Sequence, residues 1–288
     1  MRDSLVISAA LAGAATMKEH NSALPYTPEE FAEESYRCMA EGASIVHLHV
    51  RDPQTGRPTA DLDLMRTTVQ AIRDRCPGLL INLSTAISPE STVAQRIAPV
   101  PALKPDLASL NTNSMNAALA NRATGEILAE YVFTNTFAQL AEFATVMRDH
   151  GVRPELEIYD LGGMYNVLLF RKRGIIPEPL HFQMVFGLVG GVPWDLFTFA
   201  RLRELMPEGA SWSVCGVGPM QVQAGMCAAV NGGHIRVGLE DSTRMPDGSL
   251  AQGSWEQVRW AAQVARLAGR PVATPEQTRA IVHLPAPQ

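Results

Sequence analysis

The sequence has few cysteines and none of them form a close pair. Its 288 residues include four, and no two are separated by only two residues. A disulfide framework needs a higher density of cysteine, and a thiolate zinc site needs closely spaced pairs. Both are excluded as organising features, and we expect reduced thiols at Cys38, Cys76, Cys215 and Cys227.

The chain also lacks a long apolar segment and an excess of basic residues. No stretch approaches the roughly 20 apolar residues that span a bilayer, and the apolar start of the chain has no convincing signal-peptide cleavage site. Lys and Arg number 24 against 29 Asp and Glu, with the two signs interspersed. We therefore expect a cytoplasmic protein that binds neither nucleic acid nor membrane.

What the sequence does contain is an alternation of short apolar runs and amphipathic stretches along its whole length. Hydrophobic residues make up 46% of the chain, enough to bury a sizeable core. Alternation of this kind is typical of β-strands followed by helices. The predicted strands are Leu5–Ala12, Ser44–Val50, Leu79–Thr85, Leu107–Thr112, Glu155–Tyr159, Phe182–Gly187, Trp212–Val217 and His234–Leu239.

Helices are predicted between these strands, and several carry start and stop signals. Thr27 and Pro28 begin the first helix, which should end near Gly42. The others are predicted at Leu64–Arg75, Ser91–Ile97, Phe137–His150, Tyr165–Arg173, Trp194–Leu205, Val222–Val230 and Ser254–Leu267.

Eight near-equal units without a linker favour a closed (β/α)8 TIM barrel, with residues 1–288 as one catalytic domain. An open, doubly wound sheet is the structural alternative. In a barrel of this type the chemistry lies at the carboxyl ends of the strands, so functional residues are sought there.

Two histidines on the second predicted strand suggest a metal site. His47 and His49 are two residues apart, so their side chains point to the same face of the strand. Zinc binds neutral imidazole, and a catalytic zinc site has three protein ligands and an open position. Two histidines are one ligand short, and a pair of structural core histidines is the alternative.

The last predicted strand supplies the missing carboxylate. It ends in Glu240 and Asp241, and Glu240 could complete a zinc site with the two histidines of the second strand. Arg236 lies within an apolar run and needs a buried anionic partner, for which Asp241 is the natural candidate. The alternative is that Asp241 or Ser242 caps a helix.

Other polar residues follow the strand ends around the same rim. Ser84 could donate a hydrogen bond to a carboxylate or enolate oxygen, and Glu157 is either a catalytic acid or a structural ion-pair partner. Backbone amides near Gly216 and Gly218 precede a helix and could bind an anion, although a Gly-x-Gly pattern is weak and a plain tight turn is the favoured explanation. The predicted substrate contacts are Ser84, Thr85, Ser109, Asn111, Gly216 and Gly218.

Taken together, these segments resemble the beta-keto acid cleavage enzymes over essentially the whole chain. The segments that carry the resemblance are Gly13–Ala14, Leu24–Thr27, Ala43–Arg51, Leu83–Thr85, Pro154–Glu157, Gly216–Gly218 and Gly233–Gly238. The resemblance implies a homo-oligomeric barrel, a tetramer, with zinc bound by His47, His49 and Glu240. It also implies catalytic roles for Ser84, Arg236 and Asp241 and for an acid of the fifth strand, which we place at Glu157.

The reaction that the resemblance implies is an acyl transfer between a small β-keto acid and acetyl-CoA, giving acetoacetate and a new acyl-CoA. The family member that acts on 3-keto-5-aminohexanoate has a glutamate for the substrate ammonium, where this chain has Ala15. A buried cation would have no partner there, so a neutral or apolar substrate tail is expected. The alternatives are a zinc aldolase, lyase or hydrolase that works without coenzyme A, and a non-catalytic binding barrel.

Overall fold

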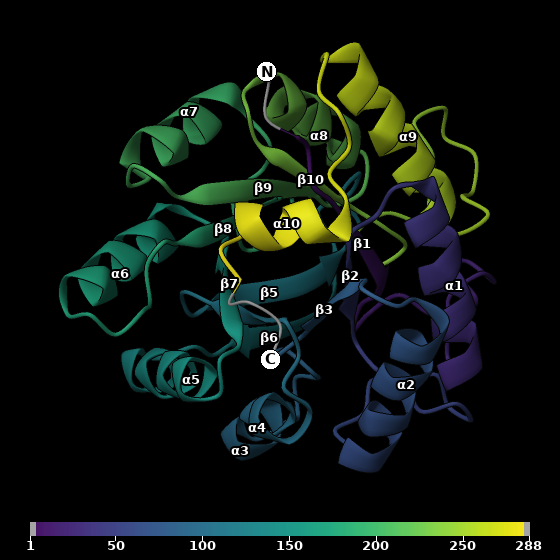
Figure 1. Cartoon of the computed structure of the whole chain (residues 1–288), viewed down its shortest axis with the longest axis horizontal. Coiled ribbons are helices and arrows are strands. Elements are labelled where there is room, and N and C mark those ends of the chain that lie inside the picture. Colours follow the sequence, from purple (N-terminus) through teal and green to yellow (C-terminus); the bar gives the residue numbers. More distant parts are fainter. Residues whose placement is uncertain (1–3, 285–288) are drawn as a thin grey trace.

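A computed structural model describes residues 4–284, so the predicted domain limits at 1 and 288 lie outside the described residues. Within that range, eight parallel strands close into a barrel in the order β1-β10-β9-β8-β7-β4-β3-β2 (Figure 1). The predicted barrel is confirmed, and an open sheet is excluded. The strands are β1 (Ile7–Ala12), β2 (Ile45–Leu48), β3 (Leu80–Leu83), β4 (Leu107–Asn111), β7 (Arg153–Ile158), β8 (His181–Phe186), β9 (Ser211–Gly216) and β10 (His234–Val237).

Helices surround the barrel, and each predicted helix is present. In α1 the predicted start is confirmed by a capping box, in which Thr27 accepts from the Glu30 amide and Glu30 accepts from the Thr27 amide. None of the helices within residues 4–284 is long and apolar enough to cross a membrane. The helices are α1 (Pro28–Glu41), α2 (Leu62–Arg75), α3 (Val93–Ile97), α4 (Pro99–Leu103), α5 (Phe137–Asp149), α6 (Leu161–Lys172), α7 (Leu196–Leu205), α8 (Met220–Val230), α9 (Ser254–Leu267) and α10 (Pro275–Ile281).

One predicted boundary is wrong by four residues. Helix α6 begins at Leu161 and not at Tyr165, because the Asp160 side chain accepts a hydrogen bond from the Gly163 amide and caps the helix. The two glycines at its start disfavour helix formation by propensity, and the cap outweighs that cost. Gly163 also permits close packing, since a Cβ there would lie 2.5 Å from the Thr112 hydroxyl.

The two faces of the barrel strands have different chemistry. Residues that face outward, such as Leu110, Leu156 and Phe182, belong to a continuous apolar cluster packed beneath the helices. Residues that face inward include His47, Glu155 and other buried polar side chains. Because successive residues of a strand point to opposite faces, the apolar residues pack against the helices and the polar residues line the barrel interior.

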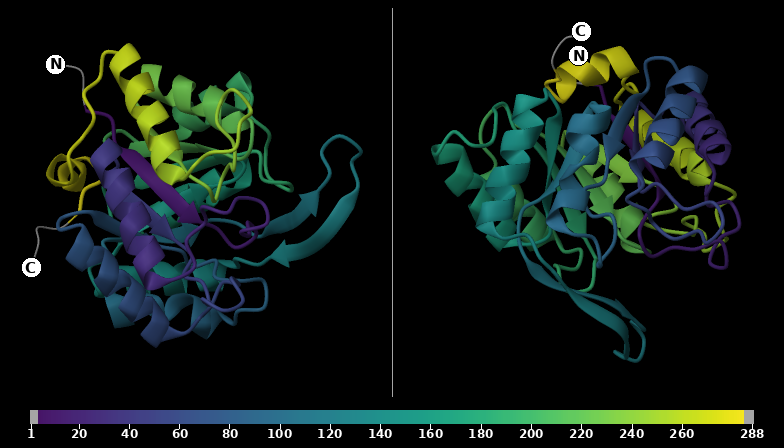
Figure 2. Two further views of the ribbon diagram at one scale, coloured as in Figure 1. Left: turned by 90° about the vertical axis from the view of Figure 1, so that its right-hand side faces the viewer. Right: turned by 90° about the horizontal axis from the view of Figure 1, so that it is seen from below.

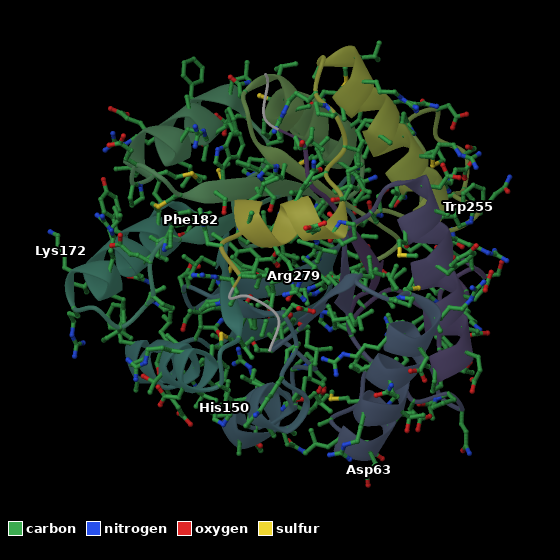
Figure 3. All side chains as sticks on the ribbon, in the orientation of Figure 1. Asp63, His150, Lys172, Phe182, Trp255 and Arg279 are labelled. Carbon is green, nitrogen blue, oxygen red and sulfur yellow. The ribbon has the colours of Figure 1, made fainter. Side chains whose placement is uncertain are left out.

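Helix α10 closes the amino-terminal end of the barrel. Ile45 and Leu80 form an apolar layer with the first and last segments of the chain, including Val282. Arg279 of α10 also forms a 2.5 Å ion pair with Asp106, which precedes β4. In Figure 3 the labelled Arg279 lies over the middle of the barrel, whereas labelled Asp63, His150 and Lys172 lie at its periphery. The barrel floor is therefore apolar and covered.

A β-hairpin that the sequence analysis did not predict follows β4. Strands β5 (Met115–Ala120) and β6 (Ile127–Phe133) pair only with each other and project from the carboxyl end of the barrel, on the side away from α10 (Figure 2). Its exposed apolar side chains are Leu119, Ile127, Leu128, Tyr131 and Val132. The missed signal was the turn around Gly125, which has a positive φ and joins two short apolar runs.

Candidate metal centre and active site

Three predicted ligands converge at the carboxyl end of the barrel. The Nε2 atoms of His47 and His49 each lie 3.6 Å from Oε1 of Glu240. Zinc bonds of about 2.1 Å at tetrahedral angles place ligand atoms about 3.4 Å apart, so this spacing suits one shared cation. The pairing of β1 with both β2 and β10 brings Glu240 next to the histidines.

The surroundings of these ligands fit a metal better than a structural histidine pair. The Nδ1 atoms of both histidines and Oε2 of Glu240 are buried without a hydrogen-bond partner among the described residues. Burial, assisted by the nearby charge of Arg236, lowers the pKa of His47 to about 4 against the opposing effect of Glu240. His47 is therefore neutral near pH 7, which is the form that binds a metal.

Arg236 holds a group of carboxylates beside the three ligands. Its Nε and Nη2 donate to Asp241 at 2.9 and 3.0 Å, and its Nη2 also donates to Glu240 at 2.5 Å. Its Nη1 lies 3.6 Å from Glu157. The predicted Arg236–Asp241 pair is confirmed, and Asp241 is not a helix cap because the next helix, α9, follows Gly253. One guanidinium faces two buried carboxylates and the partly buried Glu240, so a divalent cation would improve the charge balance.

The two carboxylates that are not metal ligands hold protons more readily than usual. Burial and the charge of Glu240 raise the pKa of Asp241, although Arg236 opposes them. Burial raises the pKa of Glu157 to about 7, again against Arg236. Carboxylates with raised pKa values are suited to accepting and returning a proton near neutral pH.

The predicted hydroxyl residues of the rim have different roles. Ser84 lines the same small cavity as His49, and its hydroxyl oxygen accepts from the Ala86 amide at 3.1 Å. Because the hydroxyl oxygen is the acceptor in this bond, its proton can point toward a ligand in the cavity. Thr85 and Ser109 instead bind each other's backbone at 2.8 and 3.0 Å and brace β3 against β4.

Tyr159 is a site residue that the sequence analysis missed. Its hydroxyl donates to Asn111 at 2.8 Å and also contacts the Glu157 carboxylate, so it links two predicted site residues. The alternation of strand residues contained the signal, because Tyr159 is two positions after Glu157 and faces the same way. The Asp160 side chain, in contrast, caps α6 and lies outside this network.

The prediction of an anion site at Gly216 and Gly218 is not supported at Gly218. Its amide already donates to the Asp241 carbonyl at 2.8 Å. Gly216 packs against the start of α8, where a Cβ would lie 2.5 Å from the Gln221 nitrogen. These glycines therefore bring β9 and α8 close to Asp241, in agreement with the alternative of a tight turn.

The loop after β1 determines where Glu240 can lie. A Cβ on Gly13 would lie 2.5 Å from Cγ of Glu240, so only glycine leaves room for that side chain. Arg51, which is fully buried, fixes the same loop by donating to the carbonyls of Gly13 and of Thr16, the latter at 2.8 Å. The position of the Glu240 side chain therefore depends on the position of the loop that Arg51 holds.

Replacing Gly13 by alanine is expected to weaken metal binding about tenfold or more, because the added methyl displaces the Glu240 carboxylate. Affinity would be measured by competition with a chromophoric chelator. Ala14→Ser is the control, because Ala14 is an exposed neighbour of Gly13 in the same loop and the change should leave the affinity unaltered. Equal affinity of Gly13→Ala and wild type would contradict the packing argument.

A parallel barrel with two histidines, a glutamate and a buried Arg–Asp pair at its carboxyl end defines a candidate metal-dependent enzyme. The sequence profile of the beta-keto acid cleavage enzymes matches residues 4–284. The chain belongs to this family, as the resemblance predicted.

Two characterised relatives are similar over nearly their whole length. The chain is 37% identical to 3-keto-5-aminohexanoate cleavage enzyme of Fusobacterium nucleatum, with 99% of each chain covered. It is 35% identical to 3,5-dioxohexanoate:acetyl-CoA acetone transferase of Paraburkholderia graminis, covering 97% of this chain and 96% of the relative. Family members with different keto acid substrates are thus about equally similar to it.

A solved structure with the same fold is the ternary complex of ObcA with a C4-CoA adduct and oxalate. It superposes with a TM-score of 0.70 at 26% identity, and the match covers 91% of this chain and 68% of the ObcA chain. The barrel described above is therefore shared with a protein crystallised with a coenzyme A adduct.

Proposed function

We propose that this chain is a zinc-dependent acyltransferase that cleaves a β-keto acid with acetyl-CoA as co-substrate, releasing acetoacetate and a new acyl-CoA. The observation that carries the proposal is the group formed by His47, His49 and Glu240 beside the Arg236–Asp241 pair, in a member of this family. The relatives named above act on β-keto acids, and one has acetyl-CoA in its name. The whole chain would act as one catalytic barrel.

His47, His49 and Glu240 would hold the zinc ion, which when bound supplies Lewis acidity to the keto and carboxylate oxygens of the substrate. Asp241, oriented by Arg236, would remove a proton from the carbon between these two groups. That carbon then attacks the acetyl carbonyl of acetyl-CoA and expels the coenzyme thiolate. The thiolate attacks the keto carbon, and cleavage of the carbon–carbon bond gives the new acyl-CoA and the carbanion of acetoacetate. Protonated Asp241 would return its proton to that carbanion, so acetoacetate is released and the enzyme is restored.

The remaining residues would orient the substrate and stabilise charge. Ser84 lines the cavity beside His49 and would donate its hydroxyl proton to the oxyanion that forms at the keto carbon. Glu157, with a pKa of about 7, would share the Arg236 guanidinium with Asp241 and is the alternative acid for returning the proton. Asn111 would contact the substrate carboxylate, and Thr85 and Ser109 would keep the rim rigid.

The substrate tail is proposed to be neutral or apolar. Ala15 lies on the exposed loop after β1, close to Glu240, since neighbouring Thr16 donates to the Glu240 carbonyl at 3.4 Å. An alanine there offers no charge to a cationic substrate. We also propose a cytoplasmic homotetramer, which the exposed apolar hairpin β5–β6 supports because an isolated two-stranded ribbon is marginally stable alone.

The test is turnover of a panel of neutral, acidic and cationic β-keto acids by the zinc-loaded protein, with and without acetyl-CoA. Both acetoacetate and the new acyl-CoA would be followed by mass, and we expect both only when acetyl-CoA is present. Consumption of the keto acid without acetyl-CoA would instead identify an aldolase, lyase or hydrolase. No turnover of any keto acid by zinc-loaded protein would favour a binding barrel.

A further inference from the structure

A buried polar layer lies inside the barrel, beneath the metal ligands. His47 of β2 pairs in register with Asn82 of β3, so the two side chains are neighbours on the inner face of the barrel. Glu155 reaches the same place from β7, where one carboxylate oxygen accepts from Nδ2 of Asn82 at 2.6 Å. All three side chains are almost completely buried. None of them except His47 takes part in the proposed reaction.

The hydrogen bond between Asn82 and Glu155 fixes which way the amide points. A carboxylate only accepts, so the amide nitrogen must face Glu155 and the amide oxygen must face away from it. That oxygen, Oδ1 of Asn82, and Nδ1 of neighbouring His47 are both buried without a hydrogen-bond partner among the described residues. One of these atoms is an acceptor and the other can carry a proton, so they are complementary.

His181 keeps the carboxylate of this layer charged. Its Nε2 lies 3.8 Å from the second oxygen of Glu155, and its Nδ1 is hydrogen bonded to Ser211 at 2.9 Å. Burial alone would raise the pKa of Glu155, but His181, and to a smaller extent His47 and Arg236, lower it below its ordinary value. An ionised Glu155 is the stronger acceptor for the Asn82 amide.

We propose that Asn82 and Glu155 are positioning residues of the metal centre, in which Glu155 orients the Asn82 amide so that its oxygen accepts the Nδ1 proton of His47, directly or through one buried water. With that proton on Nδ1, the Nε2 lone pair of His47 is left for the cation. Histidine ligands commonly donate their second ring N–H to a carbonyl or carboxylate in this way. This inference rests on the metal centre of the proposed function.

Metal affinity of variants tests the proposal without measuring catalysis. Asn82→Leu removes the acceptor and Glu155→Gln removes the group that orients it, and each is expected to bind Zn²⁺ about 10- to 100-fold more weakly in chelator competition. Glu155 is proposed to act on His47 only through the Asn82 amide. The double variant should therefore bind Zn²⁺ no more weakly than Asn82→Leu alone. Glu34→Gln is the matched control, since Glu34 is also a buried acid and accepts from the Trp255 amide outside the barrel.

A second measurement needs no variant, so misfolding cannot leave the proposal undecided. In ¹⁵N-histidine NMR spectra of the metal-free wild type, neutral His47 should already carry its proton on Nδ1, because the Asn82 oxygen accepts it. A proton on Nε2, wild-type affinity in Asn82→Leu and Glu155→Gln, or an equal loss in Glu34→Gln would overturn the inference while leaving the metal centre intact. Failure of the wild type to bind any divalent metal would overturn both.

Discussion

The Asp241→Asn enzyme is expected to turn over a β-keto acid and acetyl-CoA about 10³-fold more slowly than the wild type, because the amide cannot accept a proton from carbon. The substitution preserves the size of the side chain and one oxygen for the Arg236 guanidinium, which now donates to both Asp241 oxygens. The fold and the metal content should therefore be retained. The measurements are kcat/KM with the best keto acid of the panel and zinc content by atomic absorption.

Asp160→Asn is the matched control for this prediction. Asp160 lies at the same end of the barrel, but its carboxylate caps α6 and contacts Asn113 at 2.9 Å. Asparagine is an equally good N-cap, so this variant should remain close to wild-type activity. Retention of more than about a tenth of wild-type activity by Asp241→Asn would assign the proton transfer to another group, with Glu157 as the next candidate.

Removal of the metal is expected to lower activity at least about 10³-fold, since a Lewis acid contributes several kcal/mol to stabilising the carbanion. Dialysis against a chelator should abolish turnover, and addition of Zn²⁺ should restore it. His49→Gln should show the same loss without restoration, because Glu240 and His47 would be left as two ligands.

The control is His150→Gln at an exposed position at the end of α5, which should leave both zinc content and activity unchanged. Full activity in the chelated enzyme, with zinc shown to be absent, would refute the metal-dependent reaction. Restoration by cobalt, manganese or nickel in place of zinc would leave the role of the ligands intact and change only the identity of the metal.

The barrel and the grouping of His47, His49 and Glu240 were predictable from the pattern of the strands. Strand alternation placed His47 and His49 on one face, and the closed order of eight strands placed β10 beside β1 and hence Glu240 beside the histidines. The Arg236–Asp241 pair followed from the cost of burying an unpaired guanidinium. These predictions required only the period of the strands and the closure of the sheet.

The features that sequence did not predict depend on contacts between distant segments. Nothing local to Asn82 indicates that its amide bonds to Glu155, 73 residues later in the chain and two strands away in the barrel. Tyr159 joins the site because β7 lies beside β4 and Asn111. The Gly218 amide is bound by the Asp241 carbonyl, which only the tertiary structure reveals.

The floor beneath these residues has a kinetic consequence. Because α10 and the apolar layer around Ile45 and Val282 close the amino-terminal end, both substrates of the proposed reaction would have to enter and leave through the opposite mouth. A small keto acid held at the histidines would lie deep, and the long coenzyme would lie above it. A shared entrance of this kind would impose an order of addition, with the keto acid bound first and acetoacetate released last.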